Sequence, residues 1–132
     1  MLSIIKKWFN KGEADLEIHL PKDETDTFIL KVENVELGVL HCENGEWEFK
    51  YSDGFKTKQD TYTHIVGFPN VNKIYHSDTL WPFFRIRIPG LKQPSVQEII
   101  KKENIDQHNE AALLKRFGQK TIANPYELVY AG

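Results

Sequence analysis

Histidine and cysteine are the residues of this 132-residue chain best suited to catalysis or metal binding, and their spacing supports neither. The histidines are scattered, whereas the ligands of a metal site are normally clustered. Cys42 directly follows His41, and neighbouring strand residues point to opposite faces, which argues against a Cys–His nucleophile. We find no glycine-rich phosphate loop, G-x-S-x-G elbow or H-E-x-x-H helix. The sequence therefore predicts no catalytic residue, no metal ligand and no cofactor.

An aromatic segment with two arginines is the strongest candidate for a binding site: Leu80-Trp81-Pro82-Phe83-Phe84-Arg85-Ile86-Arg87-Ile88-Pro89. Three large aromatic side chains in four positions are more than one short helix can bury on one side. Trp and Arg are also the residue types that dominate protein interfaces. We predict that Trp81, Phe84, Arg85 and Arg87 bind a partner. Phe83 and Phe84 should also anchor the segment, while Trp81 and the two arginines reach outward.

Two other functions compete with a protein-binding module. A single-stranded nucleic acid could stack on the aromatics Trp47, Phe49 and Tyr51, with Arg85 and Arg87 at its phosphates. However, 17 basic and 19 acidic residues give a net charge of −2, and alternating aromatics are typical of any half-buried strand. We therefore expect no direct contact with nucleic acid. The third alternative, a small enzyme, lacks any recognisable site.

Strands are predicted in the first half of the chain, where apolar residues alternate with polar ones. The pattern gives strands over 27–33, 35–43 and 46–51, with one apolar face carrying Trp47, Phe49 and Tyr51. Asn44-Gly45 is the dipeptide preferred in a two-residue type I′ turn. A loop over 55–62 should lead to a further strand over 63–68, and a last strand should cover 126–130.

Three helices are predicted in the second half. Asp78-Thr79 should cap a short helix that tolerates Pro82 in its first turn. Ser95 and Glu98 form a capping box for the second helix. Asp106 should cap the third, with Gly118 at C′. The fold class is therefore α+β, a small antiparallel β-meander sheet packed with about three helices in the C-terminal half.

The chain as a whole has the length and composition of one domain, at 15.4 kDa with 40% hydrophobic residues. Residues 1–26 are expected to form an N-terminal amphipathic helix, with Leu2, Ile5, Trp8 and Phe9 on one side, and a polar extension. No apolar run approaches the ~20 residues needed to span a bilayer. The single Cys42 fits a reducing compartment, so we expect a cytoplasmic protein.

Residues 27–130 resemble the N-terminal subdomain of HipA-type Ser/Thr kinases. The resemblance rests on Gly38-Val39-Leu40, Trp47-Glu48-Phe49-Lys50-Tyr51, Trp81-Pro82-Phe83-Phe84 with Ile88-Pro89, and Ala112-Leu113-Leu114 before Phe117-Gly118. It defines residues 27–132 as a HipA N-terminal-like domain. As a separate protein, this domain is similar to the small HipS-like subunit of split toxin–antitoxin systems. That likeness implies an antitoxin-like, non-catalytic subunit that docks on a HipA-type kinase in trans and restrains it. It also implies a helix-turn-helix DNA-binding protein in the same complex, and no membrane.

Overall fold

The computed structural model describes residues 18–53, 55, 65 and 67–132, so the predicted amphipathic helix at the N-terminus lies outside the described residues. In chain order the elements are β1 (Asp26–Val32), β2 (Val35–Glu43), β3 (Glu46–Tyr51), β4 (Tyr75–Ser77), α4 (Pro82–Arg85), α5 (Pro94–Lys102), α6 (Glu110–Phe117) and β5 (Glu127–Tyr130). The strands form one antiparallel sheet in the order β4-β3-β2-β1-β5. The predicted α+β class is confirmed.

The β1-β2-β3 meander follows the sequence prediction to within one residue at each end. Its two turns share one backbone geometry. Glu33 and Asn34 have φ angles of 48° and 68°, and Asn44 and Gly45 have φ angles of 54° and 77°. A type I′ turn requires positive φ at both central residues, so each hairpin closes with the turn that matches the twist of its strands.

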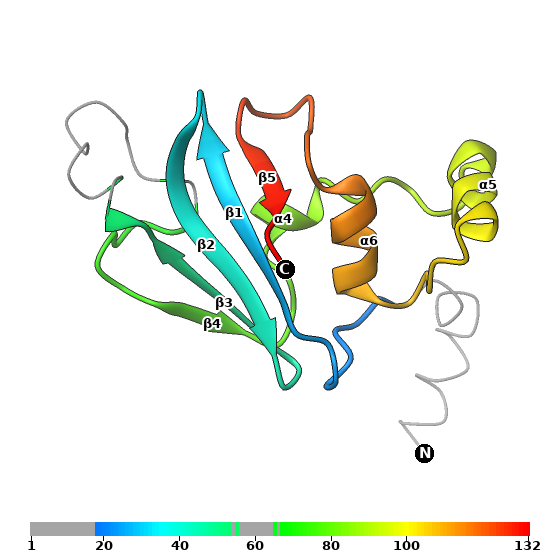
Figure 1. The fold of residues 1–132 in the computed structure, drawn as a ribbon, viewed down its shortest axis with the longest axis horizontal. Helices are drawn as coiled ribbons and strands as arrows, with labels where there is room; N and C mark the ends of the chain where they lie inside the picture. The colour runs from blue at the N-terminus through cyan, green and yellow to red at the C-terminus, as the bar shows by residue number, and fades with distance from the viewer. Residues whose placement is uncertain (1–17, 54, 56–64, 66) are drawn as a thin grey trace, which may run out of the picture.

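One face of the sheet carries the main hydrophobic core. Trp47, Phe49 and Tyr51 are buried there, as the alternation predicts. Phe84 of α4 and Leu114 of α6 pack into the same cluster, so both helices contribute to this face. Figure 1 shows α4 behind β1 and β5, with α6 and α5 beyond the β5 edge. A second cluster, formed by Leu91, Val96, Ile100 and Leu113, fixes α5 to α6.

The fourth strand does not lie where the sequence predicts it. Of residues 63–68, the described ones, Ile65, Gly67 and Phe68, form no strand. Phe68 N donates to Ile65 O at 2.9 Å, and both apolar side chains are buried in the core. The apolar pattern there reflects burial beside the sheet. The strand that does pair with β3 is β4, which comprises three residues in a polar context.

Two predicted N-caps are wrong because proline opens the helix, and a third is displaced. Helix α4 begins at Pro82 and α5 at Pro94, each without a side-chain cap, so Ser95 already lies inside α5. Pro82 occupies the first turn, as predicted. The N-cap of α6 is Asn109, whose side chain accepts from Ala112 N, whereas Asp106 accepts from His108 N in the preceding turn.

Gly118 ends α6 as the C-cap with φ of −86°, and not at C′ as predicted. Close packing explains the glycine, because a Cβ at this position would lie 2.4 Å from Leu114 O. The final strand was predicted over 126–130 and is observed as β5, which pairs with β1.

Candidate functional site

The predicted binding segment, residues 80–89, forms α4 and the turn after it, and its side chains divide between the interior and the surface. Phe84 is fully buried, with its ring centroid 5.5 Å from that of Phe49 and 5.9 Å from that of Phe68. The prediction that Phe84 anchors the segment to the sheet is confirmed. A side chain in this position offers no surface to a partner.

Arg87 is also interior, so the expectation that it reaches outward is wrong. It is buried, and its guanidinium donates to Gly118 O, Gln119 O, Asn124 Oδ1 and Tyr126 O at 2.9–3.4 Å. Burial lowers the pKa of Arg87 to about 10, which leaves it charged at neutral pH. The cation thus organises the backbone between α6 and β5.

Trp81 is neither fully buried nor fully exposed. It is the N-cap residue of α4 and is half-buried at the edge of the main core. Its ring packs edge-on against Phe68 with centroids 5.2 Å apart, and its centroid is 6.4 Å from that of Phe84. Trp81 therefore combines a core contact with an exposed part that a partner can reach.

Arg85 is held at the surface by a carboxylate that the sequence did not single out. Its Nη1 donates to Glu110 Oε2 at 3.2 Å, while the side chain of Arg85 remains 42% exposed. Glu110 is buried and also accepts from Trp47 Nε1 at 2.6 Å. Desolvation raises the pKa of Glu110, against the opposing effects of Trp47 and Arg85. Glu110 thus connects α6, β3 and α4 through one side chain.

Next to Arg85, the surface of α4 is apolar and hollowed. A shallow depression of about 610 Å³ is lined by Thr79, Leu80, Pro82, Arg85 and Ile86, and these five residues define the α4 surface. Ile86 is 58% exposed, and it is the exposed large aliphatic side chain that lines this depression. Sequence analysis missed Ile86 and Pro82 as site residues. The available signal was an isoleucine between two arginines.

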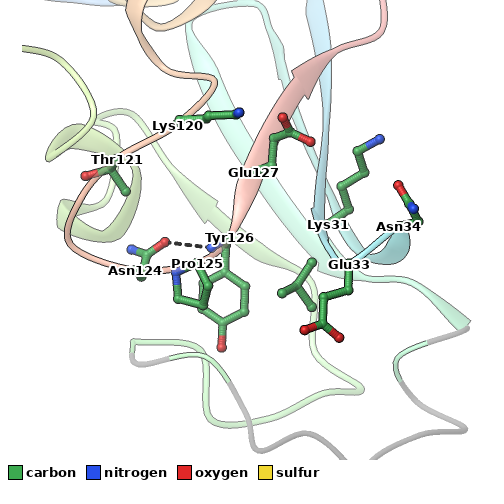
Figure 2. A pocket seen from close by; sticks show the side chains of 10 residues that line it. Lys31, Glu33, Asn34, Lys120, Thr121, Asn124, Pro125, Tyr126 and Glu127 are labelled. Atoms are coloured by element: carbon green, nitrogen blue, oxygen red, sulfur yellow. Dashed lines mark hydrogen bonds between the residues drawn. The ribbon is translucent and has the colours of Figure 1, made fainter.

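A second depression is polar. It has a volume of about 370 Å³ and lies between the β1–β2 turn and the segment from Lys120 to Glu127. Figure 2 shows Lys31 and Lys120 on either side of Glu127, with Glu33 pointing away from both lysines. Gln119 Nε2 also donates to Glu127 Oε2 at 3.1 Å. Two lysines and two glutamates balance, so the lining favours neither an anion nor a cation.

The residues named for nucleic-acid stacking do not form a stacking platform. Trp47, Phe49 and Tyr51 are buried, and the Tyr51 hydroxyl donates to Phe68 O at 2.5 Å. Cys42 is buried as well, and desolvation raises the pKa of its thiol to about 12, so it stays protonated at neutral pH. Among the described residues, no three His, Cys, Asp or Glu side chains are arranged to hold a metal ion.

Comparison with known proteins gives no family assignment. No family model matches the chain, and no curated protein matches it either. Within the described ranges, no helix has the combination of length and hydropathy needed to cross a lipid bilayer.

Proposed function

We propose that this protein is a non-catalytic binding module, an antitoxin-like subunit that docks on a separate HipA-type Ser/Thr kinase and restrains it. The observation that carries the proposal is the α4 surface, where the exposed Ile86 and a shallow apolar depression lie beside Arg85. Apolar depressions with an arginine at the rim are typical of protein interfaces. The resemblance of residues 27–130 to the kinase subdomain supports the choice of partner.

Each exposed group has a distinct part in this docking. Ile86 and Pro82 supply apolar area that contact with the kinase would remove from water. Arg85 already pairs with Glu110, and its exposed edge suits an acidic group of the kinase. The half-buried Trp81 adds the edge of its ring to the same contact. Phe84 and Arg87 hold the surface in shape from beneath.

In the proposed complex, the phosphotransfer activity belongs to the partner and not to this protein. In this proposal the kinase carries the phosphotransfer, and a helix-turn-helix protein completes the assembly. The proposal places the protein in the cytoplasm, for which the free and buried thiol of Cys42 is suitable.

Co-expression with a HipA-type kinase that lacks this subdomain, followed by co-purification and titration of the purified pair, tests the proposal. Ile86→Asp should weaken binding at least tenfold, because a carboxylate would be buried in an apolar contact. Ile122 is a matched control, since it is fully exposed in the loop between α6 and β5. Ile122→Asp should bind like the wild type. Failure of the wild-type protein to bind the kinase would contradict the proposal.

A further inference from the structure

The face of the sheet opposite the main core carries an apolar strip. Ile29 of β1 pairs with Val39 of β2 on one side and with Val129 of β5 on the other. All three side chains are only partly buried. Because α4 and α6 pack on the opposite face, none of the described helices covers this strip. We call it the open sheet face.

One end of the open sheet face is acidic. Glu43, Glu46 and Glu48 surround the β2–β3 hairpin, where they line a depression of about 230 Å³ together with His41 and Asn44. His41 Nε2 lies 3.7 Å from Glu43, and His76 Nδ1 lies 3.0 Å from Glu46 and 3.9 Å from Glu48. Lys50 pairs with Val39 farther along β3. The hairpin end thus presents three carboxylates beside two histidines, with Lys22 at the hairpin tip.

The chain contains a segment with the complementary pattern. Residues 2–11 hold the apolar side chains of Leu2, Ile5, Trp8 and Phe9, and the basic side chains of Lys6, Lys7 and Lys11. No acidic residue occurs before Glu13. An apolar strip beside an acidic hairpin is complemented by a segment that holds both apolar and basic side chains, and residues 2–11 hold both.

The described chain begins at Ile18, which packs against the cluster between α5 and α6, and it passes the acidic hairpin at Lys22. His19 pairs with Asn109, Leu20 is buried in the main core, and Lys22 packs against the hairpin tip. A Cβ on Gly45 would lie 3.2 Å from Lys22 Cγ. Residues 10–17 separate the basic segment from Ile18 and span up to about 26–29 Å when extended. The segment can therefore reach the open sheet face of its own chain.

We propose that residues 2–11 bind in cis on the open sheet face, with their apolar side chains on Ile29, Val39 and Val129 and their lysines at Glu43, Glu46 and Glu48. This binding would shield an aliphatic strip that none of the described helices covers. It requires no kinase, and it involves a surface different from the α4 surface. The two proposals can therefore fail independently.

A spin label near the N-terminus of the full-length protein tests this contact. Ser3→Cys provides the attachment point, while the buried Cys42 stays unlabelled. The backbone amide NMR signals of Val39 and Glu48 should lose at least half of their intensity. The signal of Glu98, on the exposed side of α5, is the internal control and should be retained. Equal intensities at all three positions would overturn the proposal.

Charge reversal separates a specific contact from mere proximity. Glu46→Lys with Glu48→Lys should restore the signal of Val39, because the lysines of the segment would then be repelled. Adding Lys6→Glu and Lys7→Glu to the same protein should bring the broadening back. As a matched control, Glu98→Lys with Glu103→Lys on the α5 side should leave the broadening unchanged. If the signal of Val39 is broadened equally whichever charge stands at positions 46 and 48, the proposed role of these carboxylates is contradicted.

A mixed sample distinguishes cis from trans binding. Isotope-labelled protein without a spin label is combined with spin-labelled protein of natural isotope content. Unchanged signals in the isotope-labelled chains support binding within one chain. Broadening of Val39 and Glu48 in this mixture would show that the segment binds a second copy, and would overturn the cis proposal.

Discussion

Arg85 and Arg87 lie two residues apart in the same segment, yet they belong to different regions of the molecule. Arg85 is a surface residue, with one ion pair to Glu110 and much of its side chain in water. Arg87 is an interior residue, with hydrogen bonds to the segment between α6 and β5. Two residues of the same type therefore differ completely in their availability to a partner.

The difference arises from where α4 ends. The helix contains four residues, and Ile86 is its C-cap. Arg87 N donates to Phe84 O at 3.1 Å and Ile88 N donates to Arg85 O at 3.0 Å, which are bonds to the third residue before. This tight turn directs Arg87 toward the carbonyls of Gly118 and Tyr126. The residue type alone makes each arginine a candidate for an interface. The backbone conformation of the turn determines whether its side chain points to the surface.

The largest expected effect is that of Arg87→Ala. It would leave Gly118 O and Tyr126 O without their interior donor, whereas Gln119 O still accepts from Leu128 N. The free energy of unfolding should therefore fall by at least about 3 kcal/mol. Urea unfolding monitored by circular dichroism measures this change. Arg85→Ala is the matched control and should cost only about 1 kcal/mol, because Trp47 still donates to Glu110. Equal decreases in the free energy of unfolding for the two variants would contradict the assignment of Arg87 to the interior and of Arg85 to the surface.

Trp81→Ala should have the next largest effect, on both stability and binding. The half-buried ring packs on Phe68, so its loss should lower the free energy of unfolding by about 2 kcal/mol, below the range for a fully buried tryptophan. If its exposed edge contacts the kinase, binding should weaken by about 2 kcal/mol as well. Measuring unfolding and binding on the same variant separates the two contributions. Unchanged kinase affinity would restrict Trp81 to a structural role.

These contrasts show which features the sequence can predict. The meander was predictable because its signals are local, namely alternation along each strand and Asn-Gly at the turn. The pairing of β4 was not, because three residues carry too little periodicity. The role of Glu110 depends on Trp47, 63 positions away in the sequence, and that of Arg87 on carbonyls more than 30 positions away. No local pattern encodes such partners, so the interior set of site residues could not be separated from the exposed set.

A smaller effect is expected at the hairpin tip, where a surface position is constrained by its backbone. Gly45→Val should lower the free energy of unfolding by about 1–2 kcal/mol, because a β-branched residue resists the φ of 77°. Gly90→Ala is a suitable control, since the nearest atoms to its Cβ belong to the flexible side chain of Gln93. Thermal unfolding of both variants measures the difference. An unchanged midpoint for Gly45→Val would contradict the turn geometry.

The smallest expected effect concerns pH and the buried partner of Arg85. Desolvation raises the pKa of Glu110 above its ordinary value of 4.5, so the folded protein holds this proton at pH values where the unfolded chain has released it. A raised carboxyl pKa means that stability falls as pH rises from about 4.5 through the folded pKa.

Glu110→Gln removes this titration while keeping an oxygen that accepts from Trp47. The free energy of unfolding of the wild type, relative to this variant, should therefore decline as pH rises through that window. A single group limits the slope to about 1.4 kcal/mol per pH unit. Urea unfolding at a series of pH values measures it, and Arg85→Ala should widen the window, because the arginine lowers the pKa of Glu110. A difference that grows with rising pH would mean that Arg85 and Trp47 outweigh desolvation, and that Glu110 is stabilised in its charged form.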